Sequence, residues 1–133
     1  MKYPKQLILA EAPIEARARE LWLQHAAGLT LFHNVRTIAI GEIDAALGPE
    51  AQAAARKAID DALYGLMMVI DGVIGGPSNE RYEIELKFHV QLHDRVEDKV
   101  IDDIDLFHGD GMCMGYHFWM EGDYGENPVT IPK

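Results

Sequence analysis

The sequence predicts an α+β fold, with N-terminal helices packed on a C-terminal antiparallel sheet of about three or four strands. Three observations predict this architecture. Apolar residues recur at helical spacings through residues 14–74, a break rich in Gly and Pro follows, and apolar and polar residues then alternate. The chain has 133 residues, of which 48% are hydrophobic, and this suits one domain with an ordinary core. We therefore expect a single domain over residues 1–133.

The first helix is predicted between Pro13 and Gly28. Pro13 suits the first turn of a helix, and Gly28 suits the position just after its end. The apolar residues between them are spaced three and four apart, which predicts a helix with one buried face. They are Ile14, Ala18, Leu21, Trp22 and His25.

Residues 29–48 permit two interpretations. Asn34 suits the cap of a helix that would run to about residue 47. The β-branched residues Thr37, Ile38 and Ile40 are instead typical of a strand. We favour the helix, which a Gly-Pro pair would then end.

Residues 50–74 form the strongest predicted helix. A proline precedes them, alanines are dense in their first half, and a Gly-Gly-Pro segment follows them. Residues 63–74 are apolar nearly all round, so we expect this part to be buried on most sides and to lie at the centre of the core. Asp71 and Gly72 interrupt the pattern, which predicts an irregular last turn.

The second half of the chain predicts strands. Residues 82–92 alternate between apolar and polar side chains, which predicts a long strand with one buried face. Residues 100–107 are predicted as a second strand or a short helix, and residues 108–111 as a turn. Residues 112–120 alternate again, with Met and aromatic side chains on one side, and are predicted as a third strand. The tail from Gly122 is predicted as a loop.

Charge is spread unevenly along the chain. Residues 1–59 carry six acids and seven bases, a net +1, whereas residues 60–133 carry sixteen acids and five bases, a net -11. In the last two-fifths of the chain the acids are interleaved with aromatic and Met residues. An anionic surface with apolar anchors suits the capture of a basic protein partner, and it suits neither nucleic acid nor an anionic membrane.

Six residues are predicted to contact such a partner. Four of them are carboxylates that would meet basic groups, and two are aromatic anchors. The carboxylates are Asp102, Asp103, Asp105 and Asp110, and the anchors are Trp119 and Tyr124.

No catalytic residue, metal site or cofactor is assigned from the sequence. The acids around Asp103 lack the glycine and glutamate positions of a calcium-binding loop. His89 and His93 would lie about 13 Å apart along a strand, too far for one metal ion. The favoured interpretation is that both face solvent, and the alternative is that each pairs with an acid of a neighbouring strand, such as Asp102, Asp103 or Asp105, or with His117. Cys113 and His117, four apart on a strand, would be too distant for a nucleophilic pair.

The cellular setting is predicted from two features. The single cysteine excludes an intrachain disulfide and fits a reducing compartment. The apolar runs are too short for a signal-peptide core or a bilayer span. We therefore expect a cytoplasmic protein.

Residues 61–73 read DALYGLMMVIDGV, a mostly apolar helix closed by Ile70, Asp71 and Gly72. This segment resembles one that recurs in small acidic bacterial proteins, including immunity proteins that neutralise secreted polymorphic toxins. The resemblance covers about thirteen of the 133 residues. It implies a cytoplasmic α+β antitoxin or immunity protein that binds and blocks a cognate toxin without chemistry of its own, and it assigns no site residues.

Two other functions remain open. The first is a small carboxylate and histidine enzyme, with or without a divalent metal, that would use Glu83, Glu85, His89, His93 and His117. The second is a homo-oligomeric adaptor, in the simplest case a homodimer, that would pair through an exposed apolar strand edge. Of the three hypotheses, we prefer that of a partner-binding protein.

Overall fold

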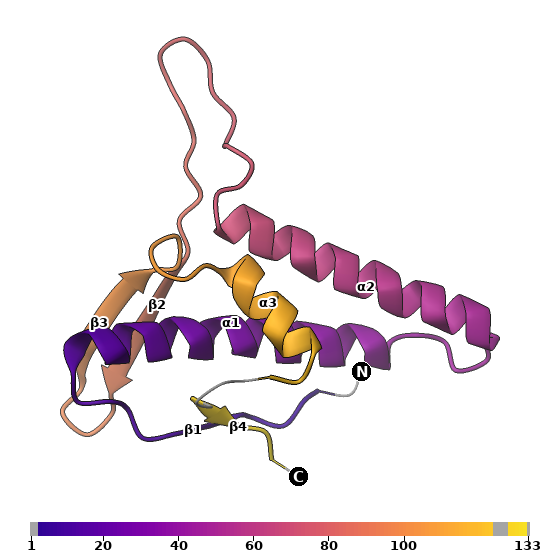
Figure 1. Cartoon of the computed structure of the whole chain (residues 1–133), viewed down its shortest axis with the longest axis horizontal. Coiled ribbons are helices and arrows are strands. Elements are labelled where there is room, and N and C mark those ends of the chain that lie inside the picture. The colour runs from indigo at the N-terminus through magenta and orange to yellow at the C-terminus, as the bar shows by residue number, and fades with distance from the viewer. Residues whose placement is uncertain (1–2, 124–127, 133) are drawn as a thin grey trace.

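The computed structural model describes residues 3–123 and 128–132, and it confirms the α+β class (Figure 1). The described strands form two separate antiparallel pairs, β1–β4 and β2–β3, in place of one sheet of three or four strands. The elements in order are β1 (Ile8–Leu9), α1 (Ala16–Gly41), α2 (Pro49–Ile70), β2 (His89–Asp94), β3 (Lys99–Asp105), α3 (Met112–Met120) and β4 (Val129–Thr130).

Helix α1 runs through Gly28, so the prediction that Gly28 ends the first helix was wrong. A Cβ at Gly28 would lie 2.2 Å from Cη2 of Trp119, and the glycine is therefore needed for close packing inside the helix. The helix favoured for residues 29–48 is confirmed as far as Gly41, as a continuation of the first. Glu15 caps the start of α1, because its carboxylate accepts the backbone N–H groups of Arg17 and Ala18 at 3.0 and 2.6 Å.

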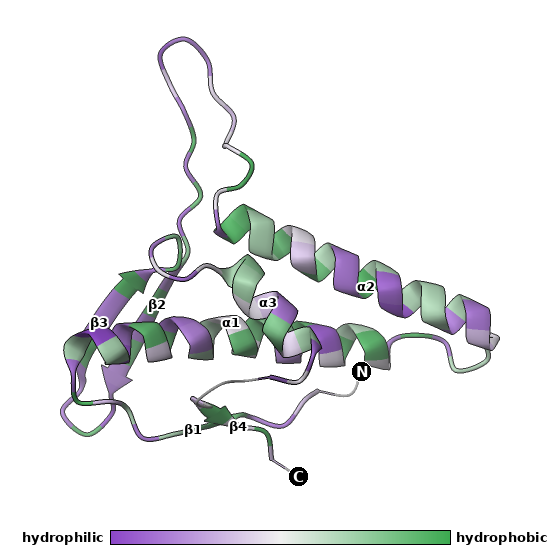
Figure 2. Ribbon diagram, viewed as in Figure 1, coloured by the Kyte–Doolittle hydropathy of each residue, from purple (hydrophilic) through white to green (hydrophobic). Residues whose placement is uncertain are grey.

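Helix α2 confirms the strongest sequence prediction. It begins with Pro49 in its first turn, and the chain turns irregularly after Ile70, where Gly72 has a φ of 68°. The prediction that residues 63–74 are buried on most sides was wrong, however. Leu63, Met67 and Ile70 are buried on one face, whereas Val69 is 36% exposed. Figure 2 shows that the C-terminal turns of α2 are largely hydrophobic, and that the segment after them has a short hydrophobic stretch near its start.

The predicted long strand at residues 82–92 is correct only in its last part. Strand β2 spans His89–Asp94 and pairs with β3, with Val90 opposite Ile104 and a bulge between Leu92 and His93. The strand reading of residues 100–107 is confirmed by β3, which ends at Asp105. Residues 72–87 instead form an extended loop that projects from the rest of the molecule, and we call this segment the arm (Figure 1).

Residues 112–120 are helical, so the prediction of a third strand was wrong. The buried residues of α3 are Met112, Tyr116 and Trp119, which are four and three apart, the spacing of a helix face. The carboxylate of Asp71 caps this helix from the end of α2, and it accepts the backbone N–H groups of Met112 and Cys113 at 2.6 and 2.8 Å. This long-range cap supplies acceptors for two otherwise unpaired donors of the first turn.

The core lies where α3 crosses between α1 and α2, and aromatic rings fill it (Figure 1). Phe32 of α1 meets Tyr116 and Trp119 of α3 at ring-centroid distances of 5.7 and 5.9 Å, and Tyr64 of α2 meets Tyr116 at 5.0 Å. The pair β1–β4 closes one side through buried Val129. The tail predicted as a loop therefore contains a short strand. No helix in the described residues has the length and hydrophobicity needed to cross a membrane.

Candidate functional site

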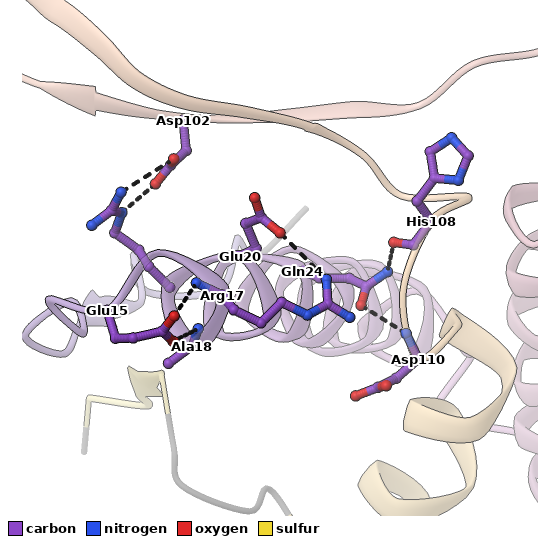
Figure 3. Close-up of polar contacts among 9 residues, drawn as sticks. Glu15, Arg17, Ala18, Glu20, Gln24, Asp102, His108 and Asp110 are labelled. Atoms are coloured by element: carbon purple, nitrogen blue, oxygen red, sulfur yellow. Dashed lines mark hydrogen bonds and ion pairs between the residues drawn. The ribbon is translucent and has the colours of Figure 1, made fainter.

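Gln24 is a buried polar residue that fixes the loop between β3 and α3. Its side chain is on α1, is 3% exposed and makes three hydrogen bonds to loop backbone atoms, of which Figure 3 draws those to His108 and Asp110. Nε2 donates to the carbonyl oxygens of Leu106 at 3.3 Å and His108 at 2.7 Å, and Oε1 accepts the N–H of Asp110 at 3.1 Å. These bonds satisfy the side-chain amide in a site with little water and hold the loop against α1.

Two shallow hollows flank Gln24, with volumes of ≈ 240 and ≈ 220 Å³. The first lies between α1 and the end of β3, and the second lies between α1 and α3; both are lined by Leu21 and Gln24. Acidic and apolar side chains from four separate segments meet around them. We call this set the Gln24 surface, and it comprises Glu20, Leu21, Gln24, Asp103, Asp105, Asp110, Met114 and Phe118.

Arg17 is the one lysine or arginine that lines the hollows beside their four acids, and Lys87 approaches Asp105 from outside them. Arg17 lies 3.3 Å from Glu20 in a mostly exposed pair, where solvent screens the attraction. Exposed apolar groups adjoin these acids, because Met114 is 58% and Phe118 is 46% exposed on α3. The surface therefore combines negative charge with apolar groups that a partner can cover.

The structure separates the acids that the sequence grouped together. Asp102 lies on the face of β3 that meets α1, where it pairs with the guanidinium of Arg19, and its side chain is 15% exposed (Figure 3). Asp103 lies on the other face of the strand with 46% of its side chain exposed. This alternation follows from the two-residue period of a strand. Asp102 is therefore committed to an internal pair, and Asp103 is accessible to a partner.

Asp103 is held by two neighbours on β2. Gln91 Nε2 donates to Oδ2 of Asp103 at 2.9 Å, and His89 Nδ1 lies 3.0 Å from its Oδ1. The hydrogen bonds from Gln91 and from His89 lower the pKa of the Asp103 carboxyl below its ordinary value. The group is therefore a fixed negative charge at neutral pH. His89 is half exposed and also pairs with an acid of the neighbouring strand, which the sequence offered as the alternative to a solvent-facing role.

Asp105 and Asp110 occupy the two ends of the loop. The carboxylate of Asp105 accepts the backbone N–H of Phe107 at 2.9 Å, lies 3.8 Å from Lys87 Nζ and is only 13% exposed. Asp110 is exposed, and its contact with Gln24 uses its backbone N–H. Figure 3 shows the Asp110 carboxylate pointing away from Gln24, and among the described residues no hydrogen bond or ion pair holds it.

Trp119 is not the exposed anchor that the sequence predicted. It is 2% exposed in the core, and its Nε1 donates to His25 Nε2 at 3.1 Å. Met114 and Phe118, on the outer face of α3, are the accessible apolar groups. They were not predicted as site residues, because a strand would have placed them with Met112 and Tyr116. The four-residue spacing of Met114 and Phe118, which places both on one face of a helix, was the signal that could have identified them. Tyr124 lies outside the described residues.

The histidines and the cysteine give no metal or nucleophile geometry. Within residues 3–123 and 128–132, no three His, Cys, Asp or Glu side chains gather closely enough to hold a metal ion. His93 Nε2 lies 3.1 Å from the Asp98 carboxylate at the hairpin turn. Burial, and then the adjacent Asp71, raise the pKa of the Cys113 thiol to about 11, so the thiol is protonated and unreactive at neutral pH.

A larger hollow of ≈ 740 Å³ lies between α1, β2 and the β1–β4 pair. Its walls are mostly apolar and include Leu23, Leu31, Phe88 and Val90. Such a lining can hold an apolar group, but it supplies no charged cluster for chemistry.

Comparison of the chain with protein-family models, curated proteins and solved structures returns no match. The similarity of residues 61–73 to immunity proteins therefore stays a hypothesis.

Proposed function

We propose that the protein is a partner-binding protein that captures a basic protein through the Gln24 surface. In the specific form of this proposal it is a cytoplasmic immunity protein that blocks a cognate toxin. The single observation that supports it most is the meeting of exposed carboxylates with exposed Met114 and Phe118 around one fixed loop. Carboxylates with adjoining apolar anchors suit a basic protein surface.

The negative charge of the chain attracts a cationic partner over a distance. The chain carries a net -10, and the half that contains β3, the loop and α3 carries -11. A field of this size speeds the encounter with a cationic partner and weakens as salt is added. Asp103 and Asp110 are the exposed charges that would meet basic side chains directly.

The rigidity of the loop supports tight binding. Three hydrogen bonds from Gln24 fix its backbone, and the Asp71 carboxylate fixes the first turn of α3 next to it. A surface that is already ordered loses less conformational entropy on binding. Met114 and Phe118 lie on that ordered helix, one turn apart, and would provide the desolvated centre of the interface.

The experiment is a pull-down with the tagged protein at low and high salt, which compares two double variants of equal charge. Asp103→Lys with Asp110→Lys changes the Gln24 surface, and Glu11→Lys with Glu42→Lys changes exposed acids away from it. We expect the unmodified chain to retain one dominant basic protein at low salt. The first variant should lose it and the second should keep it, because neither carboxylate of the first pair holds the core.

Two results would contradict the proposal. Equal loss in both variants would show that net charge alone causes retention. Retention by the first variant would show that the partner, if basic, docks elsewhere. Growth rescue on co-expression with the recovered partner then tests whether the captured protein is a toxin.

A further inference from the structure

The chain exposes more surface than a compact monomer of its mass. Its accessible surface is 9377 Å² at 14.9 kDa. A compact monomer of that mass exposes about 7,000 Å², which leaves a surplus of about 2,400 Å². The arm accounts for part of this surplus, because it extends beyond the packed body (Figure 1).

The arm is rich in exposed apolar side chains. Ile74 is 68%, Tyr82 63%, Ile84 60% and Leu86 64% exposed. Tyr82, Ile84 and Leu86 continue the same alternating face as Phe88 and Val90, which pack against the core. The alternating apolar side chains of this extended segment therefore start on the core and continue through residues 82–87, where they are mostly exposed.

The arm and the body form an apolar groove of ≈ 430 Å³. Ile74 and Ile84 of the arm line it together with Val69 of α2 and Phe107 of the loop, and Phe107 is itself 57% exposed. An apolar segment of matching size can therefore pack in the groove.

The backbone of the arm has unused hydrogen-bonding capacity. Its two legs are joined by the pairs Asn79 N–H to Tyr82 O at 2.8 Å and Ile84 N–H to Pro77 O at 2.9 Å. Beyond Ile84, the described backbone hydrogen bonds resume at the carbonyl of Phe88, which accepts from Leu106. Residues 85–87 are therefore an open extended edge of the kind that pairs with another chain.

Charge favours a second copy as the occupant of this surface. Residues 72–88 contain three acids and two bases, a net -1, in a chain of net -10. Lys87 also lies 3.5 Å from Glu85 and 3.8 Å from Asp105, which further balances the charge at the groove. Two strongly acidic chains repel each other less where the local charge is low, and the arm carries little of the net charge of the chain.

We propose that the arm is a homodimer interface, in which the arm of each copy lies in the arm-side groove of the other about a two-fold axis. Both elements belong to one self-complementary patch, which a two-fold interface requires. Covering half of the surplus on each copy would bury about 2,400 Å² in total, and obligate homodimers bury roughly 2,000–5,000 Å². This inference does not depend on the proposed function, since it concerns a different surface.

The test is sedimentation velocity of the full chain over a wide range of concentrations, with two double variants. Ile84→Lys with Leu86→Lys changes the arm, and Ile14→Lys with Val96→Lys makes the same chemical change at sites that are 96% and 95% exposed elsewhere. We expect the unmodified chain and the second variant to be dimers. The dissociation constant of the arm variant should rise about a hundredfold or more, because charges would be buried at the centre of the interface.

A measurement on the unmodified chain does not depend on whether the variants fold. Amide hydrogen exchange at residues 85–87 should slow as the concentration is raised through the dimerisation range. A monomeric chain at all concentrations would overturn the inference, as would a dimer that is unchanged in the arm variant or that leaves these amides unprotected. If the chain is a monomer, and in the pull-down only the arm variant fails to retain a different protein, the inference is also overturned, and the arm then binds that protein.

Discussion

The side-chain amide of Gln24 lies directly against the α-carbon of Gly109. A Cβ at position 109 would fall 2.3 Å from Gln24 Oε1, and Gly109 has a φ of 126°. Both the space and the backbone conformation therefore require glycine at this point. The contact connects α1 to the loop that carries Asp110, and the shape of the Gln24 surface depends on it.

Gly109→Ala should destabilise the protein by about 2–3 kcal/mol, because it combines backbone strain with displacement of the Gln24 amide. Urea unfolding followed by circular dichroism measures the change. Gly65→Ala is the matched control, since it lies within α2 and a Cβ there meets nothing within 4 Å. The control should be stabilised by about 0.5–1 kcal/mol through helix propensity. Equal effects of the two substitutions would contradict the packing argument.

Asp71→Ala should lower the free energy of unfolding by about 1–3 kcal/mol. The change leaves the backbone N–H groups of Met112 and Cys113 without their carboxylate acceptor. Asp61→Ala is the comparison, because that carboxylate is 64% exposed and pairs with exposed Lys57. It should change stability by less than about 0.5 kcal/mol. If both variants unfold at the same urea concentration as the parent, the cap has no energetic role.

Trp119→Ala should cost about 3–5 kcal/mol, because it empties a large buried site between α1 and α3. Phe118→Ala, one residue earlier on the exposed face, should cost less than about 1 kcal/mol. The same urea titration measures both. Partner binding should show the reverse order among variants that remain folded, with Phe118→Ala weakening capture. A stable, folded Trp119→Ala protein would place the indole outside the core.

The Cys113 thiol should resist alkylation in the folded protein. Burial raises its pKa from 9.0 to about 11, so the native labelling rate should rise with pH only toward that range, and the urea-unfolded chain should label at lower pH. The unfolded thiol loses its proton near pH 9 while the folded thiol keeps it, so the stability contributed by this group falls as pH rises from 9.0 to about 11. A native profile that matches the unfolded one would contradict the assigned burial.

Several features could be predicted because they depend on local sequence. Helix α2 follows from alanine density, a proline at its start and glycines after its end. Strand β3 was one of two interpretations of residues 100–107, and the turn predicted at residues 108–111 follows from its glycines. Asp103 was among several partners that the sequence offered for His89, because neighbouring strands bring such side chains together.

Other features depend on contacts between distant residues. Gly28 looked like a helix stop, but the Trp119 ring, ninety-one positions later in the sequence, needs the space that it leaves. Residues 112–120 alternate like a strand, and yet the Asp71 carboxylate caps them as a helix and Gly115 admits the indole of Trp119. A single sequence does not show which distant groups meet, so local pattern predicted the wrong element there.

By itself, the sequence determined the α+β class, the position of α2 and the concentration of acid in residues 60–133. These follow from periodicity and composition, which are properties of neighbouring residues. Only the tertiary structure decided which acids face solvent and which apolar groups adjoin them. It directed Asp102 to Arg19, buried Trp119 and left Asp103, Asp110, Met114 and Phe118 accessible, because each depends on packing between segments that lie far apart in the chain.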